Sequence, residues 1–411
     1  MLYLVYWGAA EPLGQSLVLP AVRRLAKLGT DLTLVTFEKP GDLANKDEIR
    51  RVSADLQEHG VIWKKLRYHR RPKVPATAFD FIHGCVRSVL SQLPGRPDVI
   101  HARTFVGGLM GMSLASVMRS KLIYHNEGFY PDEQVDAGVW RLNSAPHRFA
   151  KALERRLYSK SDAIVALSNR AKSIIESLPA VERKRTPVVV VPSCVDLDHF
   201  GSNRSAPYSH GDTLRIAYVG SVGGRYDFEG IGRFVSFLAR EVKLHLRIVS
   251  RSERSLVETI LDKSGLPDDA WSMNSIAYRD MPNELASQHA GLHFLRRGIS
   301  DHGGSPTKIG EYWAAGIPVV VTPNAGDTED IIRRDRVGVI VEQHTDEAYG
   351  RAARELLALL QDGALADRCR RAAEMHYALE PACARQFRLY EDLAMPRNAR
   401  ASARASGLGR L

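Results

Sequence analysis

The sequence has few cysteines and no long apolar run, and both shortages narrow the class of protein. Its four cysteines lie far apart and include no C-x-x-C pair, which argues against a zinc site and indicates reduced, structural thiols in a cytoplasmic protein. The longest apolar runs, such as residues 317–322, fall well short of the roughly 20 residues that span a bilayer. The apolar N-terminus, residues 1–7, lacks a basic leader and a small-residue cleavage site, so we expect a buried strand there and not a signal peptide.

Acidic residues are too few to balance the basic ones, and the net charge over 411 residues is +10. Such an excess favours anionic partners: lipid, nucleic acid or phosphorylated substrates. No nucleic-acid-binding motif is present and aromatic residues are not interleaved as stacking platforms, so we expect no nucleic-acid partner. A densely basic run from Lys64 to Lys73, with Trp63 and Tyr68 beside it, favours a patch that rests on an anionic membrane surface. A solvated loop is the alternative.

Short β-branched runs alternate with helical stretches, which predicts parallel sheets built from strand–helix–strand units. The pattern restarts after the polar segment 201–212, with strands expected at 214–219, 244–249, 275–278, 291–295, 318–321 and 338–341. We therefore predict an α/β protein with two Rossmann-like domains, 1–205 and 206–380, followed by a helix over 381–395. Residues 396–411 mix arginine with alanine, serine and glycine, and are expected to be a disordered basic tail. In such sheets ligands bind beyond the carboxyl ends of the strands, so two facing domains form a cleft there.

The stretch S-P-T-K-I-G-E at residues 305–311, preceded by two glycines, carries the clearest chemical signal. Ser305 is suited to cap a helix whose first residue is Pro306. The free N–H groups at a helix N-terminus suit a diphosphate, and Lys308 adds a positive charge one turn in. Glu311 lies further along the same face, placed to accept hydrogen bonds from a ribose diol. The alternative is an ordinary capped helix that feeds a buried strand.

This stretch resembles the donor-site helix of the GT-B fold, family 4 type retaining glycosyltransferases (glycosyltransferase group 1). Residues 161–168 (after Glu154), 191–200 and 218–226 resemble further family segments in the expected order. The resemblance implies a GT-B fold whose C-terminal helix packs back on the first, acceptor-binding domain. It also implies transfer of a sugar, with retention, from a nucleotide-diphosphate sugar to a glycan or lipid-linked acceptor. The usual setting is surface polysaccharide or glycoconjugate biosynthesis, in the cytoplasm and at the inner face of the membrane.

The resemblance also assigns roles to individual residues. His125, Lys308 and Arg225 are expected to be catalytic. Donor contacts are expected from Gly14, Gly220, Arg296, Gly303, Gly304, Ser305, Pro306, Thr307 and Glu311. The family often carries a paired glutamate, E-x7-E, whose first member would fall on Gly303, so the donor sugar must be held by other groups, for which the backbone amides of Gly303 and Gly304 are candidates. Lys308, an arginine and backbone amides stand in for a metal ion, and no metal or cofactor is expected beside the nucleotide sugar.

Other functions stay open at this point. A nucleotide-sugar epimerase or a phosphorylase has the same architecture, but would need its own catalytic carboxylates or a phosphate or pyridoxal site, for which the sequence shows no clear signal. A non-catalytic nucleotide-sugar-binding protein would share the fold as well. His101 and Arg103 flank a strand end and are candidates to line the cleft. The D-x-D motif at 196–198 resembles a metal-binding motif of other glycosyltransferases, but it lies at the domain boundary and is interpreted as structural.

Overall fold

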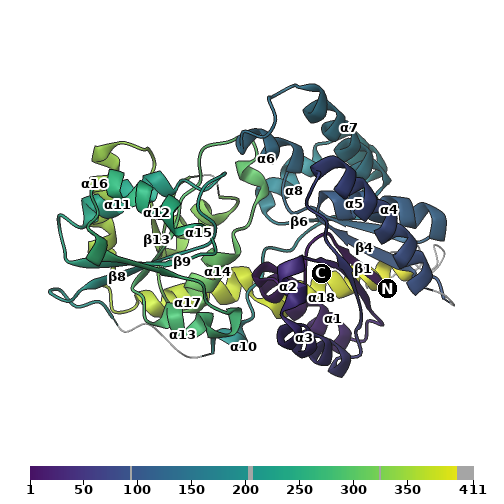
Figure 1. Cartoon of the computed structure of the whole chain (residues 1–411), viewed down its shortest axis with the longest axis horizontal. Coiled ribbons are helices and arrows are strands. Elements are labelled where there is room, and N and C mark those ends of the chain that lie inside the picture. The colour runs from purple at the N-terminus through teal and green to yellow at the C-terminus, as the bar shows by residue number, and fades with distance from the viewer. Residues whose placement is uncertain (93–94, 202–206, 324, 396–411) are drawn as a thin grey trace.

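A computed structural model describes residues 1–92, 95–201, 207–323 and 325–395 of the chain. These residues form two parallel sheets, each flanked by helices, in two domains that lie side by side (Figure 1). This confirms the predicted α/β class and the two Rossmann-like halves. The expected boundary at 205 and 206 and the expected basic tail over 396–411 lie outside the described residues.

The first sheet has seven strands in the order β3-β2-β1-β4-β5-β6-β7. The strands are β1 Leu2–Val5, β2 Thr33–Glu38, β3 Ile62–Arg67, β4 Val99–Arg103, β5 Lys121–His125, β6 Ala163–Ala166 and β7 Val188–Val190. The helices are η1 Gly14–Val18 (a π-helical turn), α1 Leu19–Lys27, α2 Pro40–Ala44, α3 Lys46–Glu58, α4 Lys73–Ser91, α5 Phe105–Met118, α6 Tyr130–Asp136, α7 Ala145–Lys160, α8 Asn169–Glu176, α9 Pro179–Lys184 and α10 Leu197–Phe200. Helices cover both faces, so central strands such as β1 and β4 are buried along their whole length and consist largely of apolar residues.

The second sheet has six strands in the order β10-β9-β8-β11-β12-β13. The strands are β8 Leu214–Val219, β9 Leu244–Val249, β10 Trp271–Asn274, β11 Ala290–His293, β12 Val319–Val321 and β13 Gly338–Ile340. The helices are α11 Phe228–Leu238, α12 Arg254–Lys263, α13 Met281–Ala286, α14 Thr307–Ala314, α15 Thr328–Asp335, α16 Asp346–Leu359, α17 Leu365–Tyr377 and α18 Leu379–Ala394, with 3-10 turns η2 Asp268–Ala270, η3 Tyr278–Asp280 and η4 Asp301–Gly303.

The strand expected at 275–278 is wrong. The edge strand is β10, whose residues pair with β9 from Trp271 to Asn274. The chain then leaves the sheet and turns through η3, so that Tyr278 comes to face the space between the domains.

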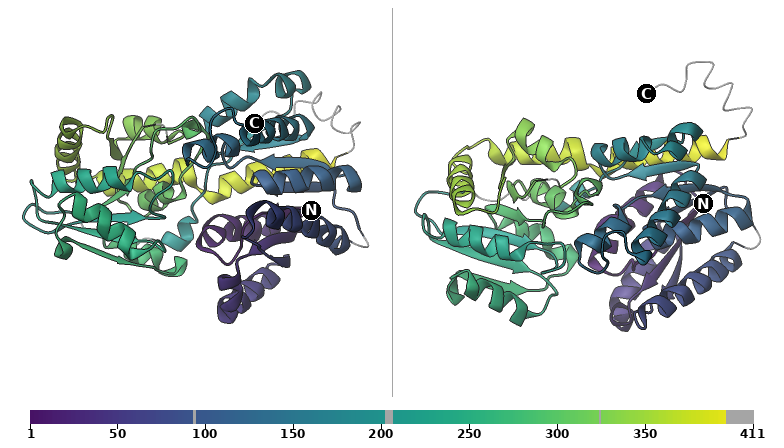
Figure 2. Two further views of the ribbon diagram at one scale, coloured as in Figure 1. Left: turned by 45° about the horizontal axis from the view of Figure 1, so that its top comes forward. Right: turned by 90° about the horizontal axis from the view of Figure 1, so that it is seen from above.

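The C-terminal helix crosses from the second domain to the first, as expected. In Figure 2 the yellow helices α17 and α18 follow one another along both domains. Ala378 separates them in an extended conformation, so α18 begins at Leu379, slightly earlier than expected. The apolar face of α18 packs with α1 in one buried cluster of the first domain. The Tyr390 hydroxyl at the far end is 2.7 Å from Nδ1 of His101, and this contact fastens the helix over β4.

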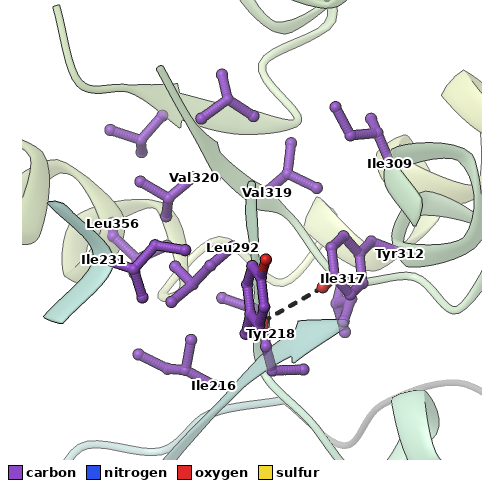
Figure 3. Close-up of a cluster of buried hydrophobic side chains, with 14 of the residues drawn as sticks. Ile216, Tyr218, Ile231, Leu292, Ile309, Tyr312, Ile317, Val319, Val320 and Leu356 are labelled. Atoms are coloured by element: carbon purple, nitrogen blue, oxygen red, sulfur yellow. Dashed lines mark hydrogen bonds between the residues drawn. The ribbon is translucent and has the colours of Figure 1, made fainter. Parts of the chain in front are cut away.

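The second domain is built around a large apolar core that holds α14 against the sheet (Figure 3). Tyr312 and Trp313 of α14 are fully buried. The Tyr312 hydroxyl accepts a hydrogen bond from the Val219 N–H at 3.0 Å, and the indole of Trp313 donates to the Val337 carbonyl at 2.9 Å. Because these bonds fix α14 to the ends of two strands, the polar residues at its start occupy defined positions at the carboxyl edge of the sheet.

The basic run lies on the edge strand β3 and on the turn that leads into α4. Lys64, Lys65 and Arg67 of β3 are exposed, and so is the turn from 70 to Lys73. Among the described residues, no helix has the length and apolar character needed to cross a membrane.

Candidate donor site between the domains

A cavity of about 700 Å³ lies between the two domains. Both walls come from the carboxyl ends of parallel strands and the loops that follow them, the place where ligands bind in sheets of this kind. The first domain contributes Trp7, Glu11, Pro12, Leu13, Ser16, Leu17, Lys39, Glu127, Glu133, Leu167 and Ser193. The second domain contributes, among others, Gly220, Arg225, Tyr226, Tyr278, His293, Asp301, Gly304, Ser305, Pro306, Thr307, Lys308 and Glu311.

The start of α14 differs from the expected capped helix. The helix begins at Thr307, and Pro306 precedes it in an extended conformation. Ser305 does not cap it: its hydroxyl accepts a hydrogen bond from the Ser193 N–H of the first domain at 3.2 Å. Ser305 therefore joins the two walls, and the N–H groups at the start of α14 have no side-chain cap.

Lys308 is the most unusual side chain in the cavity. It is only 9% exposed, and its ammonium nitrogen has no hydrogen-bond partner among the described residues. Nζ lies 4.3 Å from the ring centre of Tyr226 and 5.1 Å from that of Tyr218, contacts that stabilise a cation only in part. Burial lowers the pKa of Lys308 to about 7, although the nearby Glu311 carboxylate acts in the opposite direction. A buried ammonium without a partner attracts an anion to this position.

Glu311 lies one turn further along α14 and also faces the cavity. Burial raises the pKa of its carboxyl group to about 7, against the opposing effect of Lys308. The hydroxyl of Tyr278 is nearby on η3, where it is buried and has no hydrogen-bond partner among the described residues. This end of the cavity thus offers a carboxyl group and a phenol to a polar, uncharged group.

The glycines expected at the site serve different purposes. Gly220 follows β8 with φ +135, and a Cβ atom there would collide with Nζ of Lys308. Gly304 lines the cavity with open space around it, whereas a Cβ on Gly303 would come within 2.9 Å of the Phe129 ring. Gly14, in η1, packs against the backbone of residues 8 and 9, and its neighbours, not Gly14 itself, line the cavity.

The two candidate arginines are placed differently. Arg225 lines the cavity and forms an ion pair at 3.0 Å with Glu133 of the first domain. Arg296 is half exposed, pairs with Glu229 at 3.5 Å and is not among the residues that line the cavity. The structure therefore brings Arg225, but not Arg296, to the position beside Lys308.

His125 lies behind the cavity wall. It is fully buried, with Nδ1 at 3.0 Å from Nε2 of His101. Its Nε2 is 3.5 Å from the Glu127 carboxylate, which also pairs with Arg103 and faces the cavity. Burial, with Arg103 and His101 adding to it, holds the pKa of His125 well below its ordinary value. His125 thus meets the cavity through Glu127.

Sequence reasoning missed His293, Asp301 and Tyr278. The signal for His293 was a single polar residue at the end of an apolar strand. Asp301 is buried at the cavity wall, where its Oδ2 accepts a hydrogen bond from the Gly298 N–H at 2.8 Å.

Asp196 of the D-x-D motif caps α10, because its carboxylate accepts a hydrogen bond from the His199 N–H. No cluster of His, Cys, Asp and Glu suited to a metal ion occurs among the residues that the structure describes.

Comparison with known proteins is consistent with this geometry. Residues 16–199 match the sequence profile of Glycosyltransferase Family 4, and residues 214–359 match that of Glycosyl transferases group 1. Sucrose-phosphate synthase from Thermosynechococcus elongatus has a similar structure, with a TM-score of 0.68 and 14% identity over 95% of this chain and 98% of that one. HepE of Anabaena in complex with UDP gives 0.63 and 12% identity over 95% and 99%.

WaaG, a glycosyltransferase involved in lipopolysaccharide biosynthesis, gives a TM-score of 0.63 and 14% identity over 93% and 98% of the two chains. A search of curated protein sequences gave no match. The two matched profiles follow the two domains around the cavity, and the fold is that of the GT-B enzymes. The chain therefore belongs to the GT-B glycosyltransferases that join a family 4 domain to a group 1 domain.

Proposed function

We propose that the protein transfers a sugar from a nucleoside-diphosphate sugar to a hydroxyl group of a glycan or lipid-linked acceptor. The observation that carries this proposal is the buried, unpaired ammonium of Lys308 inside a cavity lined by both domains. Diphosphate is the anion that fits best, because the uncapped N–H groups at the start of α14 lie beside the same cation. Glu311 then accepts hydrogen bonds from the ribose.

The proposed reaction breaks the bond between the anomeric carbon and the oxygen of the diphosphate. The acceptor oxygen bonds to the same face of that carbon, which retains its configuration, and the hydroxyl proton passes to the departing phosphate oxygen. Lys308, Arg225 and the α14 amides stabilise the charge that develops on this leaving group, and fixed donors in a water-poor site do so efficiently. These cations take the place that a metal ion occupies in other transferases.

The acceptor side of the proposal rests on the first-domain wall. Glu11, Glu127 and Glu133 line it, and carboxylates suit the hydroxyl groups of a sugar acceptor. His125 acts there as a positioning residue, since it reaches the cavity only through Glu127.

Calorimetric titration with UDP-, GDP-, dTDP- and ADP-sugars tests the proposal. We expect one series to bind the full chain, and Lys308→Ala to lose most of that affinity and turnover while it keeps its secondary structure. Arg296→Ala, at an arginine outside the cavity, is the matched control and should bind normally. Retained donor binding by Lys308→Ala would contradict the placement of the diphosphate. Conversion of the nucleotide sugar to its epimer without an acceptor would favour the epimerase.

We further propose that the first domain attaches to the anionic inner face of the membrane. The exposed basic residues of β3 lead directly into α4, whose residues Phe79, Ile82, Val86 and Leu90 form one stripe at helical spacing, each more than half exposed. Apolar side chains flanked by lysine and arginine are typical of helices that lie in the lipid interface. This arrangement would bring a lipid-linked acceptor close to the cavity.

Flotation with phosphatidylglycerol and with phosphatidylcholine vesicles tests this attachment. We expect binding to the anionic vesicles alone, and a severalfold loss for the variant Lys64→Glu/Lys65→Glu. The same charge change on the other domain, Arg240→Glu/Lys243→Glu, should leave flotation unchanged. Equal losses for both variants would show a general charge effect and contradict a docking patch.

A further inference from the structure

His293 is a buried polar side chain for which the fold provides no partner. It ends β11 in the middle of the second sheet, is 1% exposed, and neither ring nitrogen has a hydrogen-bond partner among the described residues. Its backbone carbonyl does accept a hydrogen bond, from the Thr322 N–H at 3.4 Å, so the strand is satisfied and only the ring is not. A buried donor and acceptor left unpaired destabilise a protein, and such groups in a cavity wall point to a ligand.

The surroundings of the ring define which ligand group it suits. The ring faces Tyr226, with ring centres 6.0 Å apart, and the same Tyr226 lies under the Lys308 ammonium. Arg225 is the second cation close enough to act on His293, and burial together with these two charges holds the pKa of the imidazole well below its ordinary value. The ring is therefore neutral, with one nitrogen that donates and one that accepts.

We propose that His293 is a specificity-determining residue of the donor site, whose ring bonds the junction between the diphosphate and the transferred sugar. One nitrogen donates to a phosphoryl oxygen, and the other accepts from a sugar hydroxyl. This inference rests on the proposed function. A side chain at position 303 cannot hold the sugar, because Phe129 fills the space that it would need. The ring of His293 would provide such a contact instead.

A lysine or arginine at position 293 would serve the phosphate alone, because neither side chain accepts a hydrogen bond. A neutral imidazole can donate to the phosphoryl oxygen and accept from the sugar hydroxyl at the same time. Discrimination of this kind is strong, since a ligand without the matching hydroxyl leaves the buried acceptor unpaired.

The test compares three ligands of one nucleoside on the full chain: the nucleotide sugar, the nucleoside diphosphate and the nucleoside monophosphate. The wild type is first titrated with the uridine, guanosine, thymidine and adenosine series, and the series that binds is used. His293→Phe keeps a flat ring without nitrogen. We expect this variant to bind the nucleotide sugar at least about tenfold more weakly than the wild type, and to lose less affinity for the nucleoside diphosphate. Monophosphate binding should stay within about twofold, which also shows that the site is folded.

Two amide variants complete the design. His293→Asn and His293→Gln place an amide near one or the other ring nitrogen, and we expect one of them to recover part of the affinity for the nucleotide sugar. His245→Phe, a partly buried histidine of β9 outside the cavity, is the control for the exchange itself. Equal loss for all three ligands, or no loss for any, would overturn the assignment. Failure of the wild type to bind any series would overturn the proposed function, and this inference with it.

Discussion

Lys308 and Glu311 give donor binding a pH dependence that follows from their burial. In the protein without donor, burial lowers the pKa of Lys308 to about 7 and raises that of Glu311 to about 7. A bound diphosphate favours the charged lysine, and a bound ribose diol favours the charged carboxylate. Above pH 7, binding must therefore take up a proton at Lys308, and below pH 7 it must release one from Glu311. Affinity should be greatest near pH 7 and should fall on both sides.

The size of the effect follows from the two titrations. At pH 7 each group is charged about half of the time, so roughly a quarter of the free enzyme carries both charges. At pH 9 only about one lysine in a hundred is still charged, and at pH 5 the same holds for the carboxylate. Affinity should thus fall about 25-fold between pH 7 and either extreme, or roughly 2 kcal/mol.

Calorimetry with a nucleotide sugar, in buffers of different ionisation enthalpy, measures both the affinity and the protons exchanged. The intact nucleotide sugar is the right ligand, because each of its two phosphoryl groups carries one ester bond and the shared anhydride bond, and the single acidic oxygen left on each stays ionised over this range. Glu311→Gln should remove the acid limb, and Lys308→Met the alkaline limb. In Glu311→Gln the alkaline limb should begin at lower pH, since the Glu311 carboxylate raises the pKa of Lys308. Affinity that is constant from pH 5 to pH 9 without proton exchange would refute the reasoning.

Three further changes test how the site and the fold are held. Lys308→Met removes a buried ammonium without a partner, so the melting temperature should stay the same or rise although activity is lost; a large fall would mean that Lys308 supports the fold. Gly220→Ala combines φ +135 with a collision at Lys308, and should cost about 1–3 kcal/mol in urea unfolding and weaken donor binding. Trp313→Ala empties the core beneath α14 and should cost about 3–5 kcal/mol, whereas a stability within about 1 kcal/mol of the wild type would contradict the anchoring role of Trp313.

Much of the fold followed from local pattern. Buried parallel strands are mostly apolar, and the helices between them are apolar on one face only, so the alternation predicts two sheets without any knowledge of their contacts. The crossing helix was likewise placed to within a few residues. The prediction of a strand at 275–278 was wrong. Pairing with β9 ends at Asn274, Ile276 and Tyr278 line the cavity, and Tyr278 begins η3.

The chemistry at the start of α14 was partly visible in the sequence, since Lys308 and Glu311 share one turn of a helix whatever surrounds them. The burial of these two side chains and the groups that surround them were decided by the tertiary structure. Ser305 was expected to cap its own helix, and instead it accepts a hydrogen bond from Ser193, 112 positions away. Arg225 was expected to be catalytic and Arg296 to contact the donor, and the tertiary structure places only Arg225 in the cavity wall, beside Glu133 of the first domain.

The sequence by itself thus determined which residues can ionise and, for the most part, which strands and helices hold them, because those properties depend on residue type and near neighbours. Whether a charge meets a partner depends on residues that are distant in the chain. Lys308 and His293 are buried at the cavity by residues from distant parts of the chain, and none of the described residues gives the Lys308 ammonium or the His293 ring nitrogens a hydrogen bond. Because of this burial, Lys308 at the start of α14 forms part of a site that attracts an anion.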